Sequence, residues 1–122
     1  MDRDRFRRLV RRAMLSLPPE FTSQMDNVEV VVRREPSAAD RDAGEVGLED
    51  DLFGLYTGVP LTERGSYGMA LPDRIVIFQG PHERAFGPSE MGLEVRRTVH
   101  HEVAHHFGIS DERLDVLERR PR

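Results

Sequence analysis

Five residues close together in the sequence have types and spacing that could bind a metal ion and use it. His101 and His105 are four positions apart, which on a helix places them about 40° apart and one turn along, so both imidazoles can aim at one point. Glu102 lies beside this pair, where a carboxylate could take a proton from a metal-activated water. Gly108 is a residue type that ends helices in a left-handed conformation, and Asp111 could then turn back as a third ligand. The pattern predicts a zinc site (Zn2+) with His101, His105 and Asp111 as ligands and Glu102 as general base.

Other residues near the motif compete for parts of this site. Asp111 could instead complement the dipole of a short helix over 111–119 that Ser110 caps. We favour ligation because a mononuclear zinc site needs a third protein ligand. The competing carboxylates are Glu112, Asp115 and Glu118. His100 and His106 have angular positions that disagree with the metal face, so we interpret them as structural or supporting residues.

Composition narrows the classes of protein that fit. With 122 residues we expect one domain, 1–122, with a single modest core. No cysteine occurs, so any metal must be held by His and carboxylates. The net charge is −4, which makes a nucleic-acid partner unlikely. No apolar run approaches the roughly 20 residues that a membrane span needs. Arg11 and Arg12 interrupt the first apolar stretch, so we predict no export signal and no propeptide, and expect a cytoplasmic protein without a membrane partner.

Apolar periodicity predicts two long helices. Residues 3–17 carry apolar side chains at helical spacing, and arginines fill most of the other positions until Pro18 and Pro19 end the helix. This arginine face could bind nucleic acid or an anionic membrane, but we favour a solvated face balanced by acidic residues elsewhere. A further helical turn is possible over 19–24. Pro88 opens the second long helix, which continues to 107 and contains the motif.

The motif helix is predicted to have two opposite faces. One is an apolar stripe at four-residue steps that packs on the core, and the other carries His101 and His105 together with Glu94. The members of the stripe are Met91, Val95, Val99, Val103 and Phe107. Such a helix could form the wall of an active-site cleft while it packs on the domain behind.

Three segments are predicted to be strands, at 28–33, 52–58 and 74–78. The last is apolar almost throughout and is therefore predicted to be central, with Gly80 and Pro81 ending it. Glycines in the second strand, from Gly54 to Gly58, suggest a bulge or a place where another backbone comes close. Residues 35–51 and 59–72 are predicted to be loops, with a short helical turn possible over 37–42. The acidic cluster at 49–51 is interpreted as solvated loop in preference to a cation site.

The motif and its neighbours resemble a known family. The run His101-Glu102-x-x-His105-x-x-Gly108-x-x-Asp111 looks like the zincin signature in metzincin-like spacing, with Asp where most metzincins carry a third His. Segments 55–64, 71–78 and 105–111 are similar to small bacterial zincin-like metallopeptidases. The resemblance implies an α+β, minimal zincin-like fold: a small mixed sheet with a backing helix and an active-site helix. No Met follows Met91, so the metzincin Met-turn and the lower lobe of the cleft are expected to be missing.

The resemblance also implies an activity. Carried over to this sequence, His101, His105 and Asp111 would bind zinc and Glu102 would be the general base of a zinc metallopeptidase that hydrolyses a peptide or protein substrate. By analogy, 54–58 would be the edge strand along which that substrate lies. Tyr56, Tyr67 or a nearby Arg could stabilise the oxyanion.

Two other functions stay open from the sequence. A non-catalytic, metal-stabilised binding module would retain the metal without turnover. A metal-dependent RNA-processing hydrolase fits less well, because the bacterial family of that kind uses three His and lacks the Glu.

Overall fold

The computed structural model describes residues 1–44, 51–58 and 73–109. Within them, helices and strands are interleaved along the chain, and the motif lies on the last helix described. In order, the elements are α1 (Arg3–Leu15), α2 (Pro19–Thr22), β1 (Val28–Arg33), α3 (Ala38–Ala43), β2 (Gly54–Thr57), β3 (Asp73–Phe78), α4 (Gln79–Ala85) and α5 (Pro88–His106).

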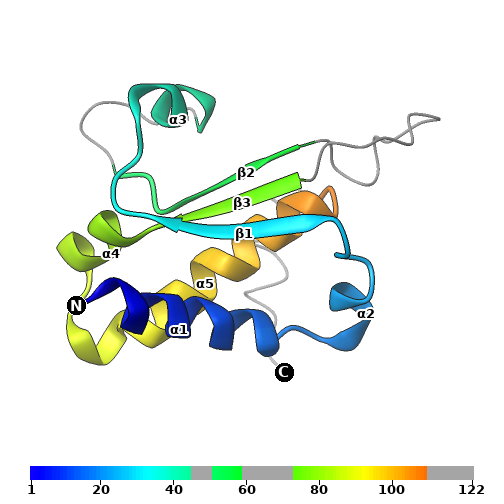
Figure 1. Ribbon diagram of the computed structural model, residues 1–122, viewed down its shortest axis with the longest axis horizontal. Helices are drawn as coiled ribbons and strands as arrows, with labels where there is room; N and C mark the ends of the chain where they lie inside the picture. The colour runs from blue at the N-terminus through cyan, green and yellow to red at the C-terminus, as the bar shows by residue number, and fades with distance from the viewer. Residues whose placement is uncertain (45–50, 59–72, 110–122) are drawn as a thin grey trace.

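The sheet is mixed and has the strand order β1-β3-β2 (Figure 1). β1 runs parallel to β3 from Val28 opposite Asp73 onward, and β2 runs antiparallel to β3 with Gly54 opposite Ile77. β3 is thus central, as its apolar sequence predicts, because a central strand buries both of its faces. Among the described residues β2 pairs with β3 alone, so β2 is an edge strand there.

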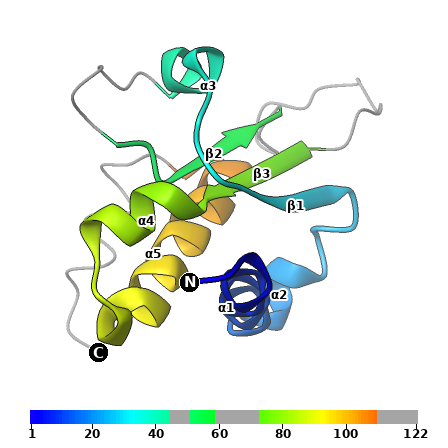
Figure 2. The ribbon, with the colours of Figure 1, turned by 60° about the vertical axis from the view of Figure 1, so that its left-hand side comes forward.

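The main core lies between the sheet and the two long helices. α1 contributes Phe6, β3 contributes Ile75 and Ile77, and α5 contributes Val95 and Val99, all almost completely buried. Figures 1 and 2 show α1 and α5 side by side on the same side of the sheet. α5 underlies β2 and β3 and so faces the edge strand, whereas α1 packs mainly on α5 and is the predicted backing helix. The arginines that fill its other positions are exposed.

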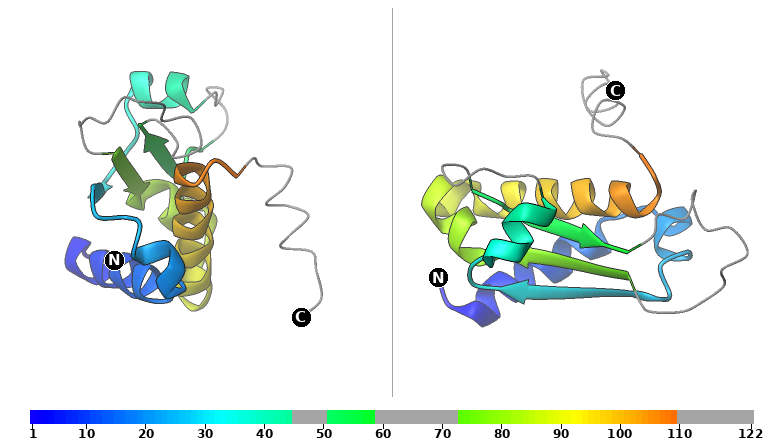
Figure 3. Two further views of the ribbon diagram at one scale, coloured as in Figure 1. Left: turned by 90° about the vertical axis from the view of Figure 1, so that its right-hand side faces the viewer. Right: turned by 90° about the horizontal axis from the view of Figure 1, so that it is seen from above.

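A smaller apolar cluster covers the opposite face of the sheet. It consists of Leu52, Leu55, Val76 and Phe78, with Val31 packed against it. α3 lies over this face, as the view from above in Figure 3 shows, and its capping residue Gly44 approaches Leu52. The site helix and α3 are therefore on opposite faces of the sheet.

Several predicted elements are confirmed, with shifted ends. β1 has the predicted bounds, β2 is shorter than 52–58, and α1 ends at Leu15, two residues before the predicted end. Short helices occur close to both of the predicted turns, at 19–22 and 38–43. The structure is a small α+β fold with a mixed sheet, as predicted.

One prediction is incomplete: Gly80 and Pro81 follow the end of the third strand but also begin a helix, α4. Pro81 is compatible with the first turn because the missing N–H has no partner in the helix there. Gly80 donates its N–H to the carbonyl of Arg34 at 2.8 Å, and a Cβ would overlap the Glu35 carboxylate. A Cβ would also lie 2.9 Å from the backbone carbonyl oxygen of Arg34, which cannot move aside as the Glu35 side chain can, so glycine is favoured at the start of α4.

Candidate metal centre

α5 places its residues on three faces rather than two. Met91, Val95, Val99 and Val103 are buried in the main core, as predicted, and Phe107 is partly buried at its end. Thr98, Glu102 and His106, spaced by four residues, face β2 and the start of β3. His101 and His105 form the third face, which is partly open to solvent. The strand-facing row was not predicted from the sequence.

The three central residues of the motif come together. One ligand atom from each of His101, Glu102 and His105 lies within 4.8 Å of the other two. The two imidazole rings are tilted at 68° with centroids 4.6 Å apart, and Nδ1 of His105 lies 3.4 Å from Oε1 of Glu102. Because zinc–nitrogen distances are about 2 Å, modest side-chain rotations would let both imidazoles bind one ion. The donor set of imidazoles and a carboxylate fits zinc.

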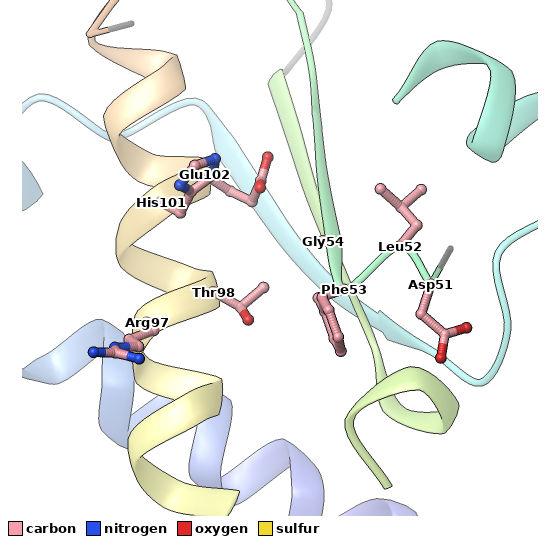
Figure 4. Close-up of a pocket in the computed structure, with 8 residues that line it drawn as sticks. All are labelled: Asp51, Leu52, Phe53, Gly54, Arg97, Thr98, His101 and Glu102. Atoms are coloured by element: carbon pink, nitrogen blue, oxygen red, sulfur yellow. The ribbon is translucent and has the colours of Figure 1, made fainter. Parts of the chain in front are cut away.

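Glu102 is the most buried member of this cluster. Its side chain is only 8% exposed and extends from α5 toward β2 (Figure 4). A buried carboxylate is costly unless a positive charge or donors balance it, and its polar contact among the described residues is the imidazole of His105. A bound cation would supply the missing compensation, which supports a metal at this position.

Gly108 has the conformation that the motif predicts. Its φ is +74°, in the left-handed region, directly after the α5 cap residue Phe107. The chain therefore turns where a third ligand would have to return to the site. Asp111 and its competitors Glu112, Asp115 and Glu118 lie outside the described residues, as do Tyr67, the helix predicted over 111–119 and the loop at 59–72.

β2 approaches α5 closely at Gly54. A Cβ on Gly54 would lie 2.8 Å from Cγ2 of Thr98 and 3.0 Å from Cγ of Glu102. The first distance is shorter than real Cβ contacts and the second is tighter than most of them, so a side chain here would require Thr98 and Glu102 to shift. The sequence suggested a bulge or the approach of another backbone at these glycines, whereas the atoms that come closest to Gly54 belong to side chains of α5.

A pocket of about 460 Å³ opens beside Glu102 and His101 (Figure 4). Its wall on the strand side comes from Asp51 through Gly54, and its wall on the helix side from Arg97, Thr98, His101 and Glu102. The carboxylate of Asp51 accepts hydrogen bonds from Arg84, which lower the pKa of Asp51 below its ordinary value. Asp51, the only described member of the acidic cluster at 49–51, is thus engaged in an ion pair.

A buried polar network closes the other end of the β2–α5 contact. The Tyr56 hydroxyl donates to Oδ2 of Asp73 at 2.9 Å, and the same oxygen lies 2.7 Å from Nδ1 of His106. Asp73 and His106 are 3% and 2% exposed. Each of the three segments that resemble the zincin-like family contributes one residue to this network: Tyr56, Asp73 or His106. That shared resemblance is the sequence signal from which the contact could have been predicted. Since the Tyr56 hydroxyl proton is engaged by Asp73, this arrangement disfavours Tyr56 as an oxyanion donor.

His100 and His82 have supporting positions outside the cluster. Nε2 of His100 lies 3.0 Å from the Ser16 hydroxyl and so connects α5 to the end of α1. His82 on α4 was not singled out from the sequence, yet it is completely buried and bonds to Thr98 in the pocket wall. A lone His after Gly-Pro gives no periodic signal, which is why sequence reasoning missed it.

Comparison with known proteins identifies the family. The family model described as zincin-like metallopeptidase matches residues 25–120, a span that includes all of the motif. The chain belongs to this family. The resemblance inferred from the sequence is thereby confirmed, and a metal, usually zinc, is the cofactor that membership in the zincin-like metallopeptidases implies.

A solved structure resembles this chain over nearly its whole length. A conserved hypothetical protein from Thermus thermophilus is 25% identical, and the match covers 98% of this chain and 100% of that one with a TM-score of 0.58. A search of curated proteins gives no match. No helix in the described part of the chain is long and apolar enough to cross a membrane.

Proposed function

We propose that this zincin-like protein is a zinc-dependent peptidase in which Glu102 is the general base. The observation that carries the proposal is the buried carboxylate of Glu102 beside two imidazoles at the edge of an open pocket. His101 and His105 would bind the ion, with Asp111 as the third ligand. Zinc, when bound, would lower the pKa of water toward 7 and polarise a carbonyl group.

Glu102 is placed to move the proton that hydrolysis requires. Its carboxylate would take a proton from the attacking water and return it to the nitrogen of the departing amine. Burial of this carboxylate beside His105 limits its movement, so little reorganisation is needed at the moment of reaction.

The exposed edge of β2 supports a peptide substrate. The Phe78 N–H donates to the Phe53 carbonyl at 2.9 Å, so Phe53 directs its backbone polar groups toward β3. Successive residues of an antiparallel strand alternate, and Gly54 therefore directs its N–H and C=O toward the edge that has no strand partner among the described residues. An extended peptide could pair with this edge next to Glu102.

The test measures metal content and hydrolysis of a mixed peptide library by the wild type and Glu102→Ala. We expect about one zinc per chain in both proteins and a loss of hydrolysis of about 10²- to 10⁴-fold in the variant. Glu90→Ala, which removes an exposed glutamate from the first turn of the same helix, is the matched control and should keep full activity. Stoichiometric zinc without hydrolysis by the wild type would overturn the peptidase proposal and favour a metal-stabilised binding module.

A further inference from the structure

The exposed side of α1 carries arginines whose charge is not neutralised locally. All six side chains are exposed, and none forms an ion pair with another described residue. These residues are Arg3, Arg5, Arg7, Arg8, Arg11 and Arg12. Several arginines elsewhere are paired; Arg84, for example, contacts Glu35 and Asp51. The acidic residues that outnumber arginine in the whole sequence therefore leave this helix face positive in the part of the chain that the structure describes.

Helix stability does not explain these arginines. Positive charge is favourable near the C-terminal end of a helix, and of the six only Arg12 lies in the last turn. Arg5 lies in the first turn, where positive charge opposes the helix dipole, and like charges four residues apart, such as Arg8 and Arg12, repel each other. Asp2 caps the helix by accepting the N–H of Arg5. An anion bound from outside would relieve the unfavourable interactions of this face.

Three of the arginines form a row that leads to the helix of the metal centre. Residues three, four or seven apart lie on one side of a helix, so Arg5, Arg8 and Arg12 share one side of α1. Ser16, four residues after Arg12, ends this row. Its hydroxyl lies 3.0 Å from Nε2 of His100, the residue before the first proposed zinc ligand. The row of positive charge therefore ends beside the metal centre.

α5 adds an arginine next to this row. Figure 1 shows α1 and α5 running in the same direction, and the contact between Ser16 and His100 joins them. Arg12 is one turn before Ser16, and Arg96 is one turn before His100, so the two arginines lie at the same level on neighbouring helices. Arg96 is exposed and pairs with no carboxylate among the described residues. We call these four residues the arginine surface: Arg5, Arg8, Arg12 and Arg96.

The chemistry of the arginine surface favours an acidic protein segment over other anions. Guanidinium groups bind carboxylates through paired hydrogen bonds. A membrane is disfavoured because α1 buries its apolar face, including Phe6 and Val10, in the core and has none to insert into lipid. Single-stranded nucleic acid needs aromatic side chains for stacking, and the exposed positions of α1 carry none. The net charge of −4 opposes a long polyanion, whereas a short segment interacts mainly with charges within about 10 Å.

We propose that the arginine surface binds an acidic segment of the protein substrate, outside the pocket beside Glu102. The assignment of this segment to the substrate rests on the proposed peptidase function, because the row of arginines ends next to the metal centre. α1 has 13 residues and is therefore about 20 Å long, a distance that an extended segment of about six residues spans. A substrate with several Asp or Glu residues on one side of the cut is held at both places.

The test compares the binding of two fluorescent peptides to the zinc-loaded full chain by anisotropy. Both peptides contain the same mixed sequence, which is extended by a run of Glu in one and by an equal run of Gln in the other. All proteins carry Glu102→Ala so that the peptides stay intact. We expect the Glu peptide to bind about 10-fold more tightly, and this preference should be lost at about 1 M salt, where the screening length falls to about 3 Å. Adding Arg8→Gln and Arg12→Gln should reduce the preference to about 3-fold or less.

Two other sets of variants exclude a general effect of charge or folding. Arg33→Gln with Arg74→Gln removes the same amount of positive charge from the strands and should keep the preference. Arg8→Glu with Arg12→Glu should instead prefer a peptide with a run of Lys, which a merely structural role of these arginines would not produce. Equal affinity of the Glu and Gln peptides, or an equal loss of preference in the strand variant, would overturn the proposal. Tighter binding of a short RNA duplex or of phosphatidylserine vesicles through the same arginines would also overturn it.

Hydrolysis kinetics separate this inference from the proposed function. With Glu102 intact, the Glu peptide should have a KM about 10-fold lower than the Gln peptide and a similar kcat, because the arginine surface does not touch the reacting bond. If the Glu peptide binds through the arginines but neither peptide is cleaved, the peptidase proposal fails and the binding of acidic segments stands. If both peptides are cleaved with equal KM and bind equally, the arginine surface fails and the peptidase proposal stands.

Discussion

The two ends of the contact between β2 and α5 are built in opposite ways. At one end Gly54 has no side chain, and Glu102 and Thr98 fill the space above it at the edge of the pocket. At the other end Tyr56 closes the gap, and its hydroxyl is bonded to Asp73, which also contacts His106. Both ends contain a buried polar residue of α5, Glu102 or His106.

The difference shows how one strand can serve both chemistry and stability. Nδ1 of His106 has a partner within the protein, the carboxylate of Asp73. Nε2 of His106 is buried and has no hydrogen-bond partner among the described residues. Among the described residues, the polar contact of Glu102 is the imidazole of His105, at 3.4 Å, and Glu102 lies next to the open pocket, where the proposed metal and substrate would reach it. At Gly54 the strand has no side chain, so residues of α5 occupy the space beside the pocket. At Tyr56 the side chain of the strand fills the space and bonds to Asp73.

Removing the carboxylate of the closed end should have the largest effect. Asp73→Ala leaves the Tyr56 hydroxyl and Nδ1 of His106 buried without this partner. We expect a loss of about 3–5 kcal/mol in the free energy of unfolding, measured by urea denaturation. Asp26→Ala, an exposed aspartate, is the control. A loss below about 1 kcal/mol would mean that the closed end does not stabilise the fold.

Filling the open end should impair the site more specifically. Gly54→Ala places a Cβ against Thr98 and Glu102, which must then move, and we expect a loss of about 1–3 kcal/mol in stability together with weaker zinc binding. Denaturation and zinc titration would measure the two effects. Adding Thr98→Ser removes the methyl group that the new Cβ meets first, and should recover part of both. No recovery in the double variant would contradict this account of the close approach.

A smaller change at the closed end is expected from Tyr56→Phe. The variant keeps the ring that packs against His106 but loses the hydroxyl that donates to Asp73. Because Asp73 keeps its contact with His106, the stability should fall by only about 1 kcal/mol. Zinc affinity, measured by competition with a chelator dye, should stay within about 3-fold. A large loss of zinc affinity would show that the two ends are coupled.

The smallest effect concerns the pH dependence of stability through His82. Burial lowers the pKa of His82 below 6.5, while the bond to Phe78 and the charge of Glu94 act in the opposite direction. The unfolded chain therefore binds this proton first as the pH falls, and the contribution of His82 to stability, complete above about pH 6.5, declines below it. Melting temperatures between about pH 8 and pH 5 should fall less steeply for His82→Leu than for the wild type, although the variant is less stable at the upper end of this range. Equal slopes would contradict a neutral buried His82.

The sequence predicted the clustering of the motif residues better than it predicted their surroundings. His101, Glu102 and His105 could be placed because they repeat within one helix, where spacing alone sets the geometry. The core stripe of α5 followed from the same periodicity. Two contacts join segments that are distant in the sequence: Thr98 with His82, and His106 with Asp73. No local sequence pattern predicts such contacts. α4 was missed because Gly80 and Pro81 usually interrupt structure, and here they lie in a first turn that tolerates both.

The main core contains residues of both α1 and α5, and this affects the order in which the protein folds. Phe6 and Val10 of α1 are buried together with Val95 and Val99 of α5, and β1 pairs in parallel with β3 across a long intervening stretch. Contacts so far apart in sequence slow folding, because a large loop must close before they form. On the ribosome, α1 would emerge long before its packing partner and wait for α5 to be synthesised. In the described part of the chain, the last core helix to be synthesised is the one that carries His101 and His105, so the proposed metal site would form together with this core.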